Sequence, residues 1–261
     1  MSKTQKIDHK LQIAISRAVI LAGQLLHSHG AESKLIEETT IRLGRALGLD
    51  QIEIALTARA IVLTTIVNTH CVTTTRTVID RGINMHMVCE IQRMTVMTER
   101  QLLGLQEVQK RLHRLKPFHY PPLLVAFMIG LSCASFSHLL GGDWPVFAVT
   151  FIASFIAMLV RQHLAKTKHN VLVNFAVTAF VATWIASFGS RFHWGEHPSI
   201  AMAACVLLLV PGFPLINAVL DLVKGYTNMG IARWFSASLL TLSVAAGIAL
   251  AMSVSGIHGW L

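Results

Sequence analysis

Carboxylates are scarce in the second half of this 261-residue chain. Residues 121–261 contain three Asp or Glu (Asp143, Glu196 and Asp221) and six Lys or Arg. Residues 1–120 contain ten Asp or Glu and 16 Lys or Arg. The earlier segment has the composition of an ordinary soluble domain, and the later one is too apolar to remain in water. The shortage also leaves no paired acid and base among the apolar runs, which argues against an intramembrane enzyme.

Cysteine pairs and glycine-rich nucleotide motifs are also missing. The four cysteines, Cys71, Cys89, Cys133 and Cys205, form no CxxC pair, so we expect neither a regular disulfide framework nor a cysteine-based zinc site. No P-loop or nucleotide fingerprint occurs, so we expect no use of ATP, no cofactor and no metal. The N-terminal residues are basic, but no apolar segment with a cleavage site follows them, so we expect no cleaved signal peptide.

Residues 121–261 offer long apolar runs instead. Five of them occupy roughly 121–140, 145–160, 171–189, 199–223 and 232–256. Four Lys or Arg precede the first run, and the second and fourth loops also carry only basic charges (Arg161, Lys166 and Lys168, then Lys224 and Arg233). The first loop and the tail have no Lys or Arg, and the third loop has Arg191 together with Glu196. By the positive-inside rule this alternation predicts an α-helical polytopic membrane protein with five spans, a cytoplasmic N-terminus and an outward-facing C-terminus.

Residues 1–120 change from helical to strand periodicity and back. Apolar residues recur at helical spacing over about 8–29 and 32–47, and then alternate with polar ones from Ile52 to Leu56. Two segments rich in Val, Ile and Thr follow around a turn at 68–70, and a helical pattern returns after Gly82. This order predicts a cytoplasmic α+β domain with two helices, a short sheet and one or two further helices.

A basic segment leads into the first apolar run. Val108, Leu112 and Leu115 lie on one side of a helical pattern that carries five basic residues, at positions 110, 111, 113, 114 and 116. Such a segment predicts a collar that binds the headgroups of membrane lipids. It also explains much of the net charge of +9, so we expect no nucleic-acid partner.

The fourth apolar run is interrupted in its middle by Pro211, Gly212, Phe213 and Pro214. Each proline lacks a backbone donor and clashes with the preceding turn, and glycine tolerates the unusual dihedrals needed between them. Counting from Ile200 at ~1.5 Å per residue puts the break about 16 Å deep, near the midplane of a ~30 Å hydrocarbon core. Backbone groups freed there must face protein or water, and transport sites often use such breaks. A proline kink that only eases helix packing is the alternative.

Polar residues near the break complete a candidate site. The second half-helix points its positive N-terminal end at the break, which suits a carboxylate, with Asn217 to hydrogen-bond the ligand and Phe213 to wall it. The substrate-binding candidates are therefore Pro211, Gly212, Phe213, Pro214 and Asn217, together with Asn174 in the third run. Asp221, the only carboxylate within the apolar runs, is the candidate proton carrier or gate, or alternatively pairs with Lys224 or Arg233.

Small residues recur every four positions in the last apolar run, at Ser243, Gly247, Ala251 and Ser255. Such a file lets two helix backbones approach closely. It predicts either packing within the chain or a docking face for another subunit, which is a separate membrane protein or a further copy of this chain. Five spans without a visible inverted repeat favour a partner or an oligomer.

Five motifs in order resemble the threonine/serine exporter family over nearly the whole chain. They are HGAES (29–33), LGRALGLD (43–50), IVLTTI (61–66), DRGINMHMVCEIQR (80–93) and LLLVPGFPLINAVLDL (207–222). The resemblance implies a cytoplasmic domain fused to five spans in the bacterial inner membrane. Longer members carry a second membrane domain in the same chain, so it also implies a split transporter completed by a separate YjjB-type membrane subunit. The split form is associated with succinate export, and the longer members with threonine and serine.

We therefore predict a subunit of a secondary exporter for a small carboxylate, with succinate the substrate that the resemblance implies, and not an enzyme. Export of threonine and serine is the alternative within transport. A membrane-anchored sensor or scaffold, in which the first 120 residues act, is the alternative from another class. A sensor needs only continuous anchoring helices, so the broken fourth run favours transport.

Overall fold

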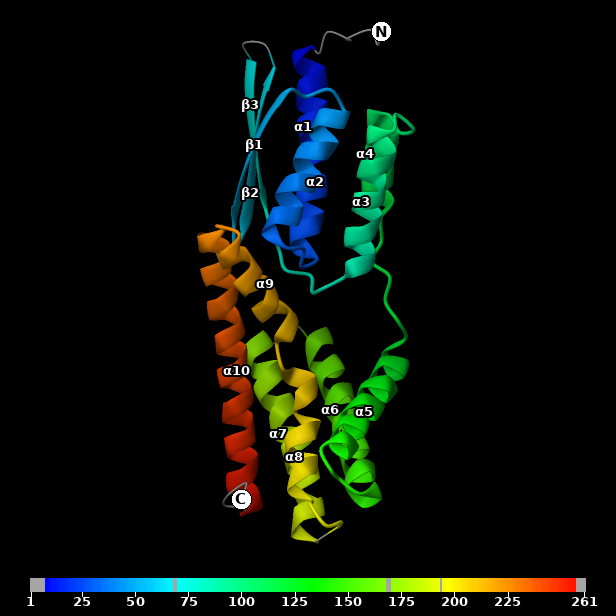
Figure 1. The fold of residues 1–261 in the computed structure, drawn as a ribbon, viewed down its shortest axis with the longest axis vertical. Helices are drawn as coiled ribbons and strands as arrows, with labels where there is room; N and C mark the ends of the chain where they lie inside the picture. Colours follow the sequence, from blue (N-terminus) through cyan, green and yellow to red (C-terminus); the bar gives the residue numbers. More distant parts are fainter. Residues whose placement is uncertain (1–7, 68–69, 168–169, 193, 257–261) are drawn as a thin grey trace. The chain divides into compact units, whose positions relative to one another are not determined.

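The computed structural model describes residues 8–67, 70–167, 170–192 and 194–256 (Figure 1). The turn expected at Asn68 and Thr69 and both chain termini lie outside the described residues. Two compact units make up the chain: unit 1 comprises residues 1–118 and 213–234, and unit 2 comprises residues 119–212 and 235–261. The segment just after the proline break thus packs with the N-terminal residues.

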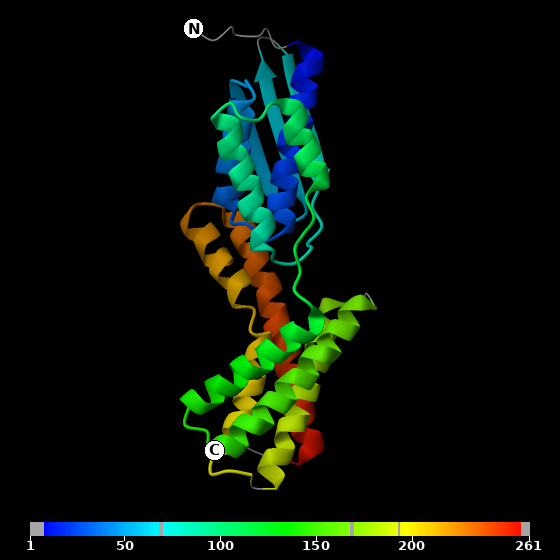
Figure 2. The ribbon, with the colours of Figure 1, turned by 90° about the vertical axis from the view of Figure 1, so that its right-hand side faces the viewer.

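Unit 1 is an α+β unit with a three-stranded antiparallel sheet in the order β1-β2-β3. Its elements are α1 (His9–Ser28), α2 (Ser33–Ala46), β1 (Gln51–Thr57), β2 (Ala60–Val67), β3 (His70–Thr77), α3 (Met85–Glu99), α4 (Leu105–Arg114) and α9 (Gly212–Val223). Helices α1 and α2 lie against one face of the sheet, and α3 and α4 pack on these helices (Figures 1 and 2). The small N-terminal sheet predicted from strand periodicity is present.

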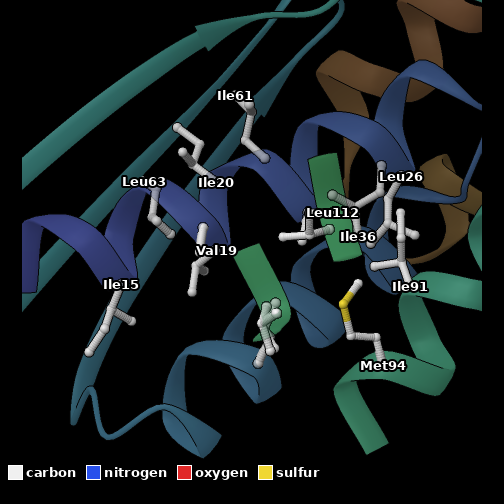
Figure 3. Close-up of a cluster of buried hydrophobic side chains, with 14 of the residues drawn as sticks. Ile15, Val19, Ile20, Leu26, Ile36, Ile61, Leu63, Ile91, Met94 and Leu112 are labelled. Atoms are coloured by element: carbon white, nitrogen blue, oxygen red, sulfur yellow. The ribbon is translucent and has the colours of Figure 1, made fainter. Parts of the chain in front are cut away.

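Alternation along β2 explains why this face of the sheet is covered. Ile61, Leu63, Thr65 and Val67 are buried, whereas the residues between them are partly exposed, as period-two patterning requires. The core that they join is drawn in Figure 3 and includes Ile15, Val19, Ile20, Leu26, Ile36, Ile91, Met94 and Leu112. On α1, Gly23 allows close packing against β2, because an added Cβ would lie 2.7 Å from Ile61 Cδ1 and would displace that side chain.

Helix α4 contributes its apolar side to this core. Val108 is fully buried and Leu112 is 3% exposed, both within the core of unit 1. The apolar side of α4 is thus occupied by protein and is not free to enter a bilayer. Its basic side chains, such as Lys110 and Arg114, remain exposed and available to lipid headgroups.

Unit 2 is a helical bundle built around small side chains. Its elements are α5 (Pro122–Leu139), α6 (Trp144–Lys166), α7 (Val171–Arg191), α8 (Ser199–Cys205), the 3-10 turn η1 (Leu207–Leu209) and, from residue 235, most of α10 (Thr227–Ser255). Ala153 and Ala157 of α6 and Ala179 and Ala182 of α7 are fully buried in the shared core. Small residues at these positions let the helix backbones approach closely, which is how helices associate in lipid.

The described residues contain five helices long and apolar enough to cross a membrane: α1, α5, α6, α7 and α10. The pair formed by residues 199–209 and 212–223 has the composition of one more span, broken in the middle, or of a re-entrant loop. The chain is therefore a mostly helical, polytopic membrane protein with a small N-terminal sheet. The helix break expected near Pro211 is present, because helical structure ends at Leu209 and restarts at Gly212.

Candidate functional site

The break begins where the backbone leaves helical geometry at Val210, with φ −65° and ψ 120°. Pro211 has no N–H, and the Gly212 N–H turns back to the Val210 carbonyl at 2.8 Å. In an uninterrupted helix that Gly212 N–H would bond to Leu208. The Leu208 carbonyl instead accepts a hydrogen bond from Arg161 Nη1 of α6 at 3.2 Å. A side chain from a neighbouring helix thus satisfies an acceptor that the break leaves free.

The proline and glycine residues of the break have different local roles. Pro211 is buried, and Pro214 lies in the first turn of α9, where a missing N–H costs nothing. Gly212 does not need the freedom of glycine, which corrects the expectation from the sequence. Its φ is not in the left-handed region, and an added Cβ would meet nothing within 4 Å. Phe213 is 38% exposed.

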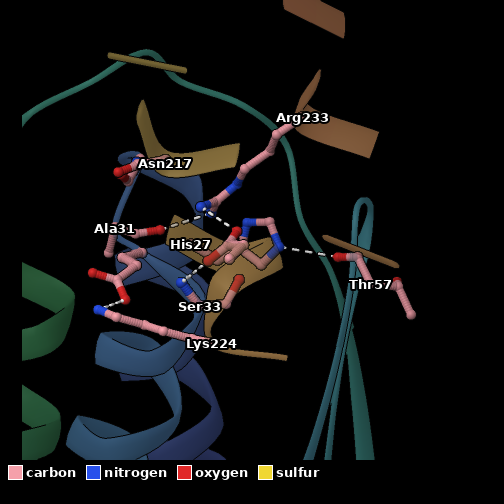
Figure 4. Close-up of polar contacts among 10 residues, drawn as sticks. His27, Ala31, Ser33, Thr57, Asn217, Lys224 and Arg233 are labelled. Atoms are coloured by element: carbon pink, nitrogen blue, oxygen red, sulfur yellow. Dashed lines mark hydrogen bonds and ion pairs between the residues drawn. The ribbon is translucent and has the colours of Figure 1, made fainter. Parts of the chain in front are cut away.

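Asp221 belongs to a polar cluster of unit 1, in which it bonds Ser33 and Arg233; Figure 4 labels these two partners. The side chain is 0% exposed; its Oδ1 accepts the backbone N–H of Ser33 at 3.0 Å, and its Oδ2 accepts Arg233 Nη1 at 2.8 Å. Arg233 Nη2 also donates to the Ala31 carbonyl at 2.7 Å. Of the two partners considered from the sequence, Asp221 pairs with Arg233; Lys224 pairs with Glu32.

The Asp221 carboxylate also acts as the cap of a distant helix. Ser33 is the first residue of α2, and Glu32 before it makes no capping hydrogen bond through its side chain. The first N–H groups of a helix have no partner within that helix and carry partial positive charge. Asp221 satisfies one of them from α9. One carboxylate therefore neutralises a partly buried arginine and caps α2.

Neighbouring contacts join the same two segments. Asn217 is 8% exposed and donates from Nδ2 to the Gly30 carbonyl at 2.9 Å. Gly30 has φ +82°, a conformation that favours glycine, and it ends α1 before the loop to α2. Tyr226, between α9 and α10, hydrogen-bonds through its hydroxyl to Glu37. Burial, followed by the Glu37 carboxylate, raises the pKa of Tyr226.

These contacts link two motifs that are far apart in the sequence. The segment 29–33, HGAES, supplies the backbone groups, and α9 with the start of α10 supplies Asn217, Asp221 and Arg233. The sequence pointed to Asn217 and Asp221 as polar residues in an apolar run. It gave no signal that segment 29–33 is their partner, because nearly 190 residues separate them.

Asn174 lies in unit 2, beside Arg161. Its Nδ2 donates to the Arg161 carbonyl at 3.3 Å, and its own side-chain and backbone oxygens accept the Thr178 hydroxyl at 3.2 and 2.7 Å. The Arg161 guanidinium carbon is 4.5 Å from the centroid of the Phe175 ring. Arg161 was considered in the sequence only as a positive charge in a loop. One feature of the sequence could have identified it: Arg161 lies at the end of the second apolar run, 13 positions before the polar residue Asn174 in the third.

The small-residue file of α10 packs within unit 2. A Cβ on Gly247 would lie 2.2 Å from the Ala176 carbonyl oxygen of α7, and Ala251 is fully buried. The Ser255 and Ser187 hydroxyls hydrogen-bond at 2.9 Å, whereas Ser243 bonds to its own helix. These contacts favour the intramolecular alternative for this file. Within the described residues, no three His, Cys, Asp or Glu side chains gather to hold a metal ion.

Comparisons with known proteins place the chain in a family. A family model described as "Putative threonine/serine exporter" matches residues 17–255. A Klebsiella aerogenes protein named "Probable succinate transporter subunit YjjP" is 50% identical over 97% of this chain and 98% of its own length. An Escherichia coli protein of the same name is 49% identical over 96% of this chain and 98% of its own length.

More distant similarity reaches the longer exporters. A Corynebacterium glutamicum protein named "Threonine/serine exporter" is 29% identical over 46% of this chain and 25% of its own length. No solved structure matches the chain. The match to the family model covers most of the chain, including the later part of α1, the sheet and the broken helix, and the resemblance stated from the motifs is confirmed. The chain belongs to the threonine/serine exporter family of membrane transport proteins.

Proposed function

We propose that this chain is one subunit of a secondary exporter for small carboxylates, with succinate as the leading substrate. The observation that carries the proposal is the near full-length similarity to two proteins named as succinate transporter subunits. The helix break and the buried polar groups around it supply a physical basis, because a discontinuous helix exposes backbone dipoles to a ligand. Transport of this kind is driven by an ion gradient and fits a chain without a nucleotide motif.

The word "subunit" in the relatives' names supports a second component, and we propose that a YjjB-type membrane protein supplies it. We further propose five spans: α5, α6, α7, the broken pair α8 and α9, and α10. Helix α1 is apolar enough to span, but its Gln12 and Ser16 side chains hydrogen-bond Thr65 within the core of unit 1. Its packing therefore favours the division that we propose, into a cytoplasmic domain, residues 1–120, and a membrane domain, residues 121–261.

The proposed orientation in the bacterial inner membrane has a cytoplasmic N-terminus and a periplasmic C-terminus. It rests on the charges of the loops, with Lys166 in the second and Lys224 in the fourth. A reporter inserted in the loop between α6 and α7 should read as cytoplasmic, and one fused to the C-terminus as periplasmic. A cytoplasmic C-terminus would contradict the five-span topology.

We propose that the break residues Pro211, Gly212, Phe213 and Pro214, together with Asn217 and Asn174, form the substrate pathway. Asn217 hydrogen-bonds the Gly30 carbonyl, so it reaches a substrate only after that bond is released. This makes the contact between α9 and segment 29–33 a gate.

Asp221 is the proposed proton-coupling group of this gate. An ionised carboxylate accepts from both of its partners, the Ser33 N–H and Arg233. Protonation removes the charge that holds Arg233 and weakens both hydrogen bonds. Proton uptake at Asp221 would therefore loosen α9 from unit 1 and free Asn217.

Export of threonine and serine is the second candidate, favoured by the family model and by the Corynebacterium glutamicum relative. Efflux of labelled succinate and labelled threonine, from cells with and without this chain and its YjjB-type partner, separates the two. Succinate efflux that needs both proteins supports the leading proposal. Efflux of threonine alone supports the second candidate. If neither efflux rate changes, the result supports a membrane-anchored sensor or scaffold.

A further inference from the structure

Arg161 is a cation without a carboxylate in the described part of unit 2. The side chain is only partly exposed and makes no ion pair with a described residue. Unit 2 contains only two acidic residues, Asp143 and Glu196. Asp143 precedes α6 and accepts the Glu196 N–H at 3.1 Å, so both lie at the opposite end of α6 from Arg161. The separation along the helix axis is roughly 27 Å at ~1.5 Å per residue.

The guanidinium is held in a defined orientation nevertheless. One donor, Nη1, bonds to the Leu208 carbonyl at 3.2 Å, and the Phe175 ring lies 4.5 Å from Cζ. A guanidinium has five N–H donors in a rigid planar fork. The Leu208 carbonyl fixes the fork with one of them and leaves others for a ligand.

Other polar groups and an open space adjoin the Leu208 backbone. Ser154 lies two helical turns before Arg161 on the same face of α6 and is fully buried, with the Cys133 thiol of α5 beside its hydroxyl. An open, mostly apolar groove of about 620 Å³ lies between α5 and residues Leu207 and Leu208, and Arg161 itself does not line it.

We propose that Arg161 is an anion-recognition residue of unit 2 and that its ligand is the carboxylate of the transported substrate. The proposal rests on the proposed function for its substrate class. A cation in an apolar surrounding is costly without a counter-charge, and a bound carboxylate supplies one. The helix break determines the position of this anion site, because the Leu208 carbonyl that it leaves free orients the Arg161 guanidinium. The same chemistry would suit the phosphate of a lipid headgroup, so the test separates the two ligands.

The test measures binding of labelled succinate to the purified full-length chain in lipid nanodiscs. Arg161→Gln should weaken binding about ten-fold to hundred-fold, as expected for loss of a charge-assisted hydrogen bond. Arg161→Lys, which keeps the charge, should recover part of the affinity. Lys166→Gln removes an exposed charge five residues further along α6 and should change the affinity less than two-fold, by roughly the screened value of a surface charge. Thermal unfolding of each variant reports whether it is folded.

The outcomes distinguish this inference from the proposed function. Binding is compared in nanodiscs of neutral lipid only and in nanodiscs that also contain anionic lipid. If Arg161→Gln changes only the binding of anionic lipid and leaves the affinity for succinate unchanged, the inference is overturned. Absence of succinate binding by the wild-type chain also overturns it. Export is measured in parallel, in liposomes that contain the chain and its YjjB-type partner. Arg161-dependent binding without any export refutes the proposed function and leaves the anion site standing.

Discussion

Replacing Asp221 by Asn tests whether the buried cluster is a charge-dependent lock. Asparagine has almost the same shape, but it offers one acceptor oxygen where Asp221 uses two, and its NH₂ group would face a donor. Either the Ser33 N–H or Arg233 must then lose its partner. Arg233 would keep its charge in a site where its side chain is only 15% exposed.

The size of the effect follows from burial. Removing one partner of a buried ion pair costs about 3–5 kcal/mol, because the remaining charge stays buried without compensation. We therefore expect Asp221→Asn to lower the free energy of unfolding of unit 1 by about 3 kcal/mol. Lys224→Gln is the matched control, since Lys224 pairs with Glu32 at the surface, with side chains 33% and 19% exposed. Breaking that pair should cost at most about 1 kcal/mol.

The measurement is pulse proteolysis of the full-length chain in membrane vesicles across a denaturant series. Arg233→Gln and the Asp221→Asn/Arg233→Gln double variant complete a cycle. If the pair acts as a unit, the second substitution adds little to the first, and the coupling reaches about 1–3 kcal/mol. Additive effects, or an Asp221→Asn chain as stable as Lys224→Gln, would refute the ion-pair account.

The same variants test proton coupling. Export by Asp221→Asn, measured per amount of folded protein, should no longer depend on external pH, because the group that takes up the proton in the proposed gate is gone. Lys224→Gln should keep the wild-type pH profile. An unchanged profile in Asp221→Asn would move the coupling group to another residue or to the partner.

Three further predictions address the packing, the break and the pH dependence of stability. Gly247→Leu should prevent folding of unit 2, seen as loss of the protein from the membrane, because even a Cβ there would lie 2.2 Å from a backbone oxygen of α7; normal levels with loss of partner binding would instead place Gly247 at an interface. Pro211→Ala with Gly212→Ala should stabilise the helix, since proline costs about 3 kcal/mol and glycine about 1 kcal/mol in a helix interior, yet abolish efflux; wild-type efflux would reduce the break to a packing kink. The Arg42 guanidinium donates to the Glu99 carboxylate at 2.6 and 2.7 Å and lowers the pKa of Glu99. The ion pair therefore adds to the free energy of unfolding above the ordinary pKa of glutamate, ~4.3, and this stabilisation is lost as pH falls through the lowered pKa. In Glu99→Gln, the free energy of unfolding should fall less on acidification than in the wild type, by less than about 1 kcal/mol because the pair is exposed. The same fall in both proteins would exclude Glu99 as a source of the pH dependence.

Local patterns in the sequence predicted the local structure. Alternation predicted the sheet, and Pro211 predicted the end of a helix, since a missing N–H acts on its own turn. The role given to Gly212 was wrong, because proline alone suffices to break the helix and the glycine sits in an ordinary conformation. Amphipathic spacing in α4 predicts that one side of the helix is buried, but not whether lipid or protein covers it; in the structure protein covers it. Headgroup binding by the exposed basic side of α4 stays a prediction.

Long-range contacts are the part that the sequence could not supply. Asp221 was identified as unusual because a carboxylate in an apolar run is costly. Its partner Ser33 contributes only a backbone N–H, which every residue except proline has, so no residue type could signal it. The same holds for Arg161 and the Leu208 carbonyl. Contacts that use backbone groups leave no trace in composition, and they hold both polar clusters of this chain together.

Arg233 and Arg161, the arginines of the two polar clusters, differ in their partners, and we therefore expect them to have different roles. Arg233 has a carboxylate partner within the chain, so its charge is already neutralised and its loss should appear mainly as lost stability. Arg161 is oriented by a carbonyl and an aromatic ring, neither of which carries a compensating charge, so its loss should appear mainly as lost affinity for an anion. Comparing Arg233→Gln with Arg161→Gln in the same stability and succinate-binding assays tests this division directly. Two variants that lose stability equally and bind succinate equally well would show that both arginines serve the fold alone.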